Sequence, residues 1–129
     1  MIADTTFLID LLKNKPEAVR KAIELDNKKE SVFTTTVTVF ELWQGVLDLQ
    51  SKEALDKIHF LLDSLGLVSL DLESAKFGGF IHARLRKEGQ TIDPEDSMIA
   101  GICLKTNQTL LTKNTKHFSR IRELRIESY

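Results

Sequence analysis

Short apolar runs alternate along the chain with longer segments in which apolar residues recur every three to four positions. The short runs predict buried strands, and the longer segments predict helices that cover them. We expect strands over residues 1–3, 31–36, 67–70 and 109–112, with a fifth strand at a sheet edge over residues 124–127. This alternation predicts an α/β fold with a mostly parallel central sheet of four to five strands, flanked by helices.

Capping residues and prolines indicate where the helices begin. Thr5 and Thr6 are predicted to cap the first helix, and Pro16 suits the first position of the second. The second helix is expected to bury Val19 and Ile23 on its apolar face. Later helices are predicted from residue 38, over residues 53–64 and 73–88, and from residue 94, which is a proline.

Three glycines lie inside predicted helices: Gly78, Gly79 and Gly101. Glycine in a helix interior costs about 1 kcal/mol relative to alanine, so these positions point to close helix packing. They lack the glycine and lysine spacing of a nucleotide-binding loop. Cys103, on the apolar face of the last long helix, is expected in the core.

Length and composition fit one domain over residues 1–129. The chain is 42% hydrophobic and 29% charged, which argues against disorder and against a disulfide scaffold. A single cysteine indicates a reducing compartment, so we expect a cytoplasmic protein. Since no apolar run approaches the roughly 20 residues that span a bilayer, no membrane association is expected. The net charge of −1 means that any nucleic-acid binding must be local.

Three carboxylates, those of Asp4, Glu41 and Asp96, lie where a strand or loop gives way to a predicted helix. Capping explains each of them singly: Thr38 and Glu41 have capping-box spacing, and Asp93 with Asp96 forms an acidic helix start. Parallel strands, however, deliver their carboxyl ends to the same sheet edge, where ligands bind near the switch in strand order. We therefore expect the three carboxylates to meet at that edge.

Three carboxylates gathered at one place repel one another strongly. At separations of about 6 Å and an effective dielectric of about 20, each pair costs roughly 2.8 kcal/mol. Such a cluster is spread out, partly protonated or filled by a cation, and ligands that are all oxygen favour Mg²⁺ or Mn²⁺ over zinc. These ions orient water and neutralise phosphodiester charge, so phosphoryl chemistry is the natural use of the site.

Basic residues lie on both sides of Asp96 in the sequence. Between Lys105 and Arg125 there are six basic residues and one acidic residue, and a second cluster covers residues 84–87. A run of charged residues often does no more than keep one face of a protein solvated. These two clusters, however, lie on both sides of Asp96 in the sequence and would suit phosphate binding. The candidate phosphate-contacting residues are Arg84, Arg86, Lys113, Lys116 and His117.

With the acids placed, the chain resembles PIN-domain proteins, and more narrowly the toxin subunits of VapBC-type toxin–antitoxin pairs. The stretch MIADTTFLIDLL is similar to the family's opening strand, aspartate, hydroxyl residues and helix. The stretch TTTVTVFELWQGV has Glu41 at the family's glutamate position. The stretch LRKEGQTIDPEDSMIAGICLKTNQTLLTKNTKHF joins a basic helix end, a glycine, Asp96 before an apolar helix, and a strand ending before a His-Phe pair. The resemblance covers essentially the whole chain and rests on the order and spacing of these pieces.

The resemblance implies that the three acids ligate or orient a metal ion, and that Thr6 supports Asp4 through its hydroxyl. The family often has a fourth acid where this chain has Asn114. A neutral amide oxygen is a weaker ligand, so one metal or a weakly held second metal is expected. Asp93 is near enough in sequence to substitute, although helix N-cap is its expected role.

The resemblance also implies an activity and partners. It implies a Mg²⁺- or Mn²⁺-dependent endoribonuclease, a VapC-like toxin that hydrolyses RNA phosphodiester bonds by metal-activated water. The implied partners are an RNA substrate, a small VapB-type antitoxin that covers the acidic groove, and a second copy in a homodimer.

Two alternatives stay open at this point. A degenerate PIN domain that binds without catalysis would fit Asn114. A phosphoacceptor receiver domain has a similar length and alternation, but it needs two adjacent acids after its first strand, where Asp4 stands alone. It also needs an acceptor aspartate after the third strand, where Asp71 has no evident partners.

Overall fold

The computed structural model describes residues 1–129 and contains a five-stranded sheet in which every neighbouring pair is parallel. The strands are β1 (Ile2–Ala3), β2 (Phe33–Thr35), β3 (Gly66–Val68), β4 (Leu110–Leu111) and β5 (Ile126–Glu127). Their order is β3-β2-β1-β4-β5, so the chain extends the sheet first to one side of β1 and then to the other. The predicted α/β fold and the predicted edge position of the last strand are confirmed.

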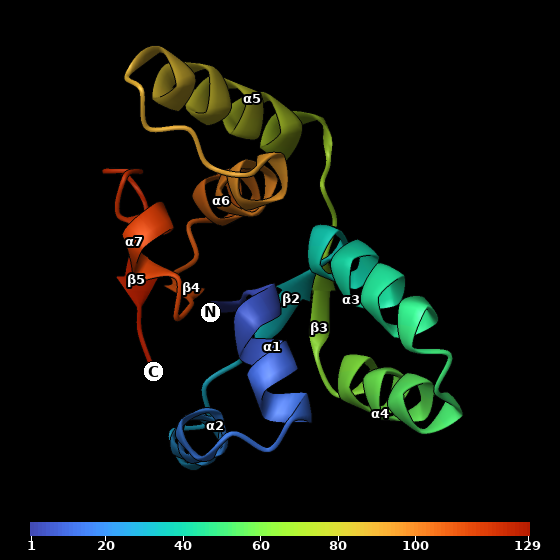
Figure 1. Ribbon diagram of the computed structural model, residues 1–129. Helices are drawn as coiled ribbons and strands as arrows, with labels where there is room; N and C mark the ends of the chain where they lie inside the picture. Colours follow the sequence, from blue (N-terminus) through green and yellow to red (C-terminus); the bar gives the residue numbers. More distant parts are fainter.

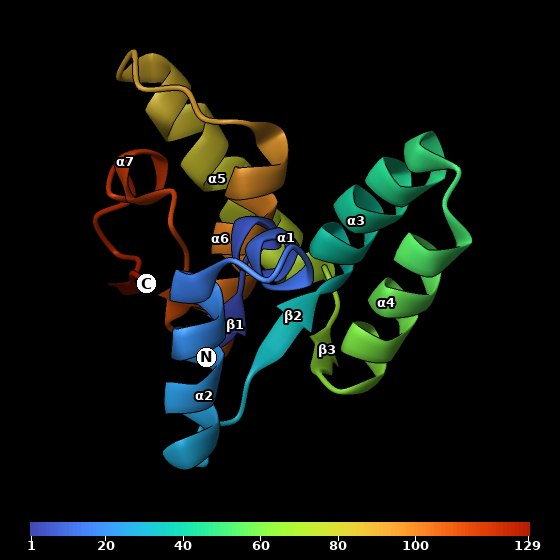
Figure 2. The same ribbon diagram turned by 60° about the horizontal axis from the view of Figure 1, so that its bottom comes forward.

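Seven helices flank the sheet. They are α1 (Thr5–Leu12), α2 (Pro16–Asn27), α3 (Thr36–Leu49), α4 (Lys52–Asp63), α5 (Leu72–Lys87), α6 (Pro94–Thr106) and α7 (Thr115–Phe118). In Figure 1, α5 and α6 lie above the sheet, α1 and α2 lie below it, and α3 and α4 form a hairpin beside β3; Figure 2 shows the same hairpin from another side. None of the helices is long and apolar enough to cross a membrane.

Alternate residues of the central strands face two separate cores. Ile2 and Leu110 belong to the core that α5 and α6 cover. Ala3 and Leu111 belong to the core on the opposite face, which α1 to α4 cover. This is the period-two alternation of a strand that is buried on both sides, and it explains why β1 and β4 are apolar throughout.

Two predicted helix features are wrong in detail. Asp4, rather than Thr5 or Thr6, caps α1, because its side chain accepts a hydrogen bond from the backbone N–H of Phe7. On α2 the buried face is rotated relative to the prediction: Ile23 is 56% exposed. Lys21 is buried instead, because its ammonium group pairs with carboxylates of α2 and β5. The predicted starts of α2 and α6 at prolines are confirmed.

The close helix packing expected of the glycines occurs at two of the three positions. A Cβ at Gly101 would lie 2.4 Å from the backbone oxygen of Ser74, and one at Gly78 would lie 2.9 Å from that of Ser97. The backbones of α5 and α6 are therefore in direct contact. Gly79 faces open space, so the expectation is wrong there. Cys103 is buried in the core, as predicted.

Candidate active site

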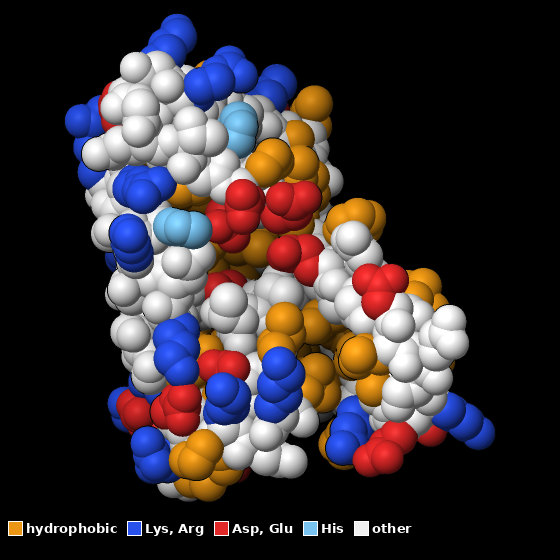
Figure 3. Space-filling view, viewed as in Figure 1, with side chains coloured by type: hydrophobic (Ala, Val, Ile, Leu, Met, Phe, Trp, Pro, Cys, Tyr) orange, Lys and Arg blue, Asp and Glu red, His pale blue; other side chains and the backbone are white.

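The structure brings Asp4, Glu41 and Asp96 together at the carboxyl edge of the sheet. Asp4 directly follows β1, Glu41 lies in the second turn of α3, and Asp96 lies in the first turn of α6. The negative charges of Asp4 and Glu41 both help to raise the pKa of Asp96. In Figure 3, acidic side chains gather in a hollow near the centre of the view, with Lys and Arg side chains along one side of it.

Asp4 is the most firmly held of the three acids. Its side chain is almost fully buried, and Oδ1 accepts hydrogen bonds from Thr6 Oγ1 at 2.7 Å and from Phe7 N at 3.0 Å. Its Oδ2 accepts a hydrogen bond from the buried Thr112 Oγ1. Burial raises the pKa of Asp4, and these hydrogen bonds oppose that rise because they favour the charged form.

Glu41 is held through a chain of hydroxyl groups. Thr5 Oγ1 donates to Glu41 Oε1 at 2.7 Å and lies 3.2 Å from Thr38 Oγ1, which in turn contacts the N-cap residue Thr35. Partial burial raises the pKa of Glu41 most, and repulsion from Glu95 raises it further. Glu41 Oε2 receives no hydrogen bond from the protein and stays available for a ligand or a water.

Asp96 receives no hydrogen bond from the rest of the chain. Partial burial, followed by repulsion from Asp93 and Glu41, raises the pKa of Asp96 to about 6. Its nearest opposite partner is His117, whose Nδ1 lies 3.6 Å from Asp96 Oδ2 and whose charge acts in the other direction. This carboxylate therefore lacks the neutralising donors that Asp4 has.

The remaining predicted residues surround Asp96. Asn114 stabilises the loop after β4, because its backbone N–H donates to Thr112 Oγ1 at 2.9 Å. Its side-chain amide Nδ2 lies 2.9 Å from His117 Nδ1. Asp93 occupies the N-cap position of α6, as predicted, but its side chain makes no capping hydrogen bond. Its charge instead adds to the acidic cluster and raises the pKa of Asp96.

The donor chemistry of this cluster fits a hard divalent cation. All the carboxylates offer oxygen, and their raised pKa values mean that added positive charge would stabilise them. No three or more His, Cys, Asp or Glu side chains form a group that could hold a metal ion as they stand. The predicted metal ligands thus lie at one site and offer oxygen atoms suited to a hard cation, but they are not close enough together to coordinate it as they stand.

Two of the candidate phosphate contacts, Arg84 and Lys113, already pair with carboxylates of the same chain. The guanidinium of Arg84 forms two hydrogen bonds with the carboxylate of Glu123. Lys113 Nζ lies 2.7 Å from Glu17 Oε1 and also approaches Asp10. Both cations are neutralised inside the molecule, whereas Arg86 and Lys116 are exposed and make no ion pair.

Sequence reasoning missed three residues of the site. Thr5 holds Glu41, Thr112 holds Asp4, and Glu95 repels Glu41. Thr112 could have been found, because it ends a predicted strand beside the central one and so had to reach the same sheet edge. Thr5 and Glu95 carried no such signal, since adjacent hydroxyl and acidic residues are common at helix starts.

The fold and the site together define an α/β protein with an acidic, oxygen-rich site at the switch point of a parallel sheet. The sequence matches the PIN domain family over residues 1–124, and the chain belongs to this family. That membership leaves no support for the receiver-domain alternative.

Several relatives span nearly the whole chain. The chain is 32% identical over 127 residues to a tRNA(fMet)-specific endonuclease VapC of Shigella flexneri, covering 98% of this chain and 95% of the relative. It is 32% identical over 123 residues to ribonuclease VapC19 of Mycobacterium tuberculosis, covering 95% of each chain. Its fold matches the structure of DNA-bound VapBC from Salmonella typhimurium with a TM-score of 0.87 and 30% identity, over 98% of this chain and 96% of that one.

Proposed function

We propose that this protein is a metal-dependent endoribonuclease of the VapC type, which uses Mg²⁺ or Mn²⁺ to hydrolyse RNA phosphodiester bonds. The observation that carries the proposal is Asp96, a half-buried carboxylate with a pKa of about 6 that has acidic neighbours and no hydrogen-bond donor. A carboxylate in that position is stabilised by a bound cation. Relatives named as ribonucleases, matched over almost the whole chain, support RNA as the substrate.

The residues of the chain have separable tasks in this reaction. Asp4, Asp96 and Glu41 would hold the cation, which when bound supplies positive charge to the phosphate and acidifies water. Thr6 and Thr112 fix the orientation of the Asp4 carboxylate. Thr5 fixes Glu41 through Oε1, which leaves Glu41 Oε2 free, and this oxygen would orient the attacking water and accept its proton. The raised pKa of Glu41 suits proton acceptance near neutral pH.

The test is RNA cleavage by the purified protein with Mg²⁺ or Mn²⁺, with EDTA, and by Asp96→Asn. We expect cleavage only by the wild-type protein with the divalent cation. Equal cleavage under all three conditions would remove the proposal. Calorimetry with Mn²⁺ tests the binding-module alternative separately, because the absence of any acid-dependent binding heat would favour that alternative.

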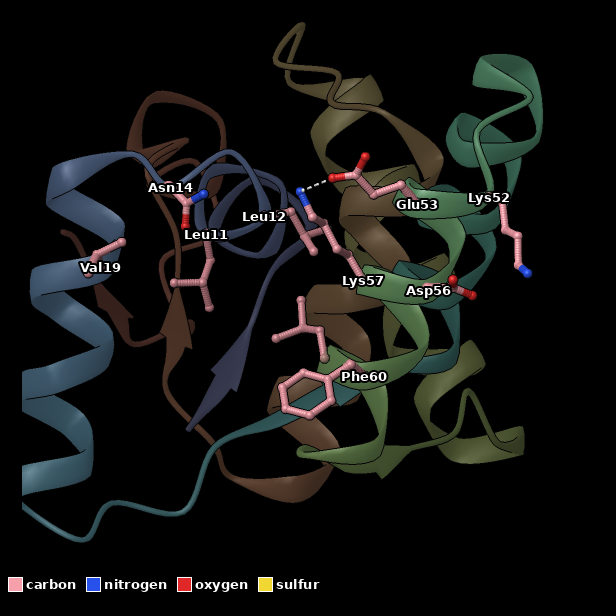
Figure 4. A pocket seen from close by; sticks show the side chains of 10 residues that line it. Leu11, Leu12, Asn14, Val19, Lys52, Glu53, Asp56, Lys57 and Phe60 are labelled. Carbon is pink, nitrogen blue, oxygen red and sulfur yellow. Dashed lines mark ion pairs between the residues drawn. The ribbon is translucent and has the colours of Figure 1, made fainter.

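We also propose a small VapB-type antitoxin as a partner, since the solved structural relatives include VapBC complexes. An apolar groove of about 900 Å³ between α1, α2 and α4 supports this partner (Figure 4). Its apolar walls include Leu11, Leu12 and Phe60, and charged residues of α4 surround it. A second groove of about 460 Å³ shares Leu12 and also reaches Glu41. Co-purification with the product of the neighbouring small reading frame tests the proposal.

A homodimer and a cytoplasmic location complete the proposed function. Exposed apolar side chains on α3 and α5, among them Phe40 and Phe80, support a homodimer. Light scattering of the purified protein is expected to give twice the mass of one chain, and a monomer at all concentrations would contradict it. The buried, unpaired Cys103 is consistent with a reducing compartment.

A further inference from the structure

The basic residues of the chain fall into two groups, those neutralised by a carboxylate and those that are not. Besides Arg84 and Lys113, a carboxylate pairs with Lys105 at 2.8 Å. Arg120 is fixed differently: its Nη1 donates to the backbone oxygen of Thr91 at 3.0 Å, so its charge is held in place without being cancelled. Only uncancelled charges are available to a phosphate, so the total count of basic residues overstates the binding surface.

The uncancelled cations near the site lie around the end of α5 and around α7. Arg86 and Lys87 occupy the last turn of α5, and Lys116 lies in α7. Contacts join these two segments: Arg84 of α5 pairs with Glu123 beyond α7, and Arg120 reaches the loop between α5 and α6. After the Arg84–Glu123 pair cancels, residues 84–90 and 115–123 carry a net charge of +4.

This positive region is continuous with the acidic site. His117, the neighbour of Lys116 in α7, lies 3.6 Å from Asp96. Arg120 is bonded to the loop that leads directly into α6, where Asp93 and Asp96 lie. In Figure 3, Lys and Arg side chains lie beside the acidic hollow. An RNA strand at the acidic site meets repulsion from the carboxylates, and adjacent cations offset that repulsion.

We propose that the uncancelled cations form one surface, the α5–α7 surface, which binds backbone phosphates of RNA next to the acidic site. This inference rests on the proposed function, because the RNA it binds is the proposed substrate. The residues of the α5–α7 surface are Arg86, Lys87, Lys116 and Arg120, whereas Arg122 pairs with Glu123 and is left out. Arg84 and Lys113 lie outside it, although their positions in the sequence suggest otherwise.

The test compares two triple variants of equal net charge in RNA binding. The first is Arg86→Gln, Lys87→Gln, Lys116→Gln. The control is Lys15→Gln, Arg20→Gln, Lys29→Gln, which removes three exposed and unpaired cations from α2 and its two ends. Binding of a fluorescein-labelled oligouridylate is measured by anisotropy in EDTA, which prevents metal-dependent cleavage, over a series of salt concentrations.

The logarithm of the binding constant falls linearly with the logarithm of the salt concentration, and each phosphate contact on a single strand contributes about 0.7 to the size of this slope. The first variant loses three contacts, so its slope should be smaller by about 2, and it should bind about a hundredfold more weakly at about 0.1 M salt. The control variant is expected to bind like the wild-type protein. Lys116→Gln alone should lower the slope by about 0.7, which provides a milder variant if the triple variant folds poorly. Equal binding by both triple variants, or no binding by the wild-type protein, would overturn the proposal.

A separate cleavage assay keeps this inference distinct from the proposed function. If the wild-type protein cleaves RNA but the two triple variants bind alike, the α5–α7 surface is wrong and the nuclease stands. If the wild-type protein binds RNA through this surface but never cleaves it with Mg²⁺ or Mn²⁺, the surface stands and the nuclease is wrong.

Discussion

Asp4 and Asp96 are the same kind of side chain at the same sheet edge, yet their surroundings are opposite. Asp4 is buried and accepts hydrogen bonds from Thr6, Phe7 and Thr112, which favour its charged form and oppose the effect of burial. Asp96 accepts none, and its acidic neighbours help to raise its pKa to about 6. The difference shows that hydrogen bonds within the chain hold one carboxylate in place, while the other has no hydrogen-bond donor and is open to an added cation.

The largest effect is expected from Asp4→Ala. This change removes the N-cap of α1 and leaves the buried hydroxyl of Thr112 without an acceptor, so the free energy of unfolding should fall by roughly 2–4 kcal/mol. Urea unfolding measures it, with Asp96→Ala as the matched loss of a carboxylate. An equal destabilisation by both changes would remove the contrast between the two acids.

Thr112→Val should have the next largest effect. The valine keeps the shape but leaves Asp4 Oδ2 without its buried donor and the backbone N–H of Asn114 without its acceptor. We expect a loss of roughly 1–3 kcal/mol in the free energy of unfolding. Chemical denaturation checks this value, and unchanged stability would mean that Asp4 is not held from this side.

Asp96→Asn should act in the opposite direction on stability. Because the pKa of Asp96 is raised in the folded protein, the protonated form of this carboxyl stabilises the fold relative to the ionised form. This stabilisation is complete below about pH 4 and is lost as the pH rises through about 6. Asparagine cannot ionise, so above pH 7 the variant should be more stable by about 1 kcal/mol after solvent screening, and equal to the wild type near pH 4. Thermal unfolding across this pH range measures the difference.

Divalent cations provide the control for that prediction. Mg²⁺ or Mn²⁺ near pH 7 should raise the Tm of the wild-type protein and should leave Asp96→Asn nearly unchanged, because ligands that bind only the folded state stabilise it. A variant that is less stable than the wild type at every pH would show that Asp96 is satisfied within the fold.

The smallest effect is expected from Thr6→Ala. The hydroxyl of Thr6 donates to Asp4 Oδ1, but Thr6 is exposed and the backbone N–H of Phe7 donates to the same oxygen. Water can replace the lost donor, so the free energy of unfolding should change by about 0.5–1 kcal/mol. A loss as large as that of Thr112→Val would contradict the view that the buried donor matters more.

The sequence predicted the meeting of the acids because that feature follows from topology alone. Once Asp4 and Glu41 follow parallel strands, their side chains reach one edge whatever the packing details. Proline likewise fixed the starts of α2 and α6, because its ring suits the first helical position.

Features that depend on distant partners could not be predicted. Whether the ammonium group of Lys113 is available to a phosphate depends on its ion pair with Glu17, which is far away in the sequence. The buried face of α2 depends on Glu127 in the last strand, which pairs with Lys21. Hydrophobic periodicity gives the existence of a helix face but not which of two adjacent positions turns inward.

The contact between the backbones of α5 and α6 at Gly78 and Gly101 has a consequence for motion. Because no side chain separates the helices at these two positions, we expect them to move as one body and to carry Asp96 with them. Glu41 lies on α3, outside that body. A displacement of α3 relative to α6 would therefore change the separation between Glu41 and Asp96.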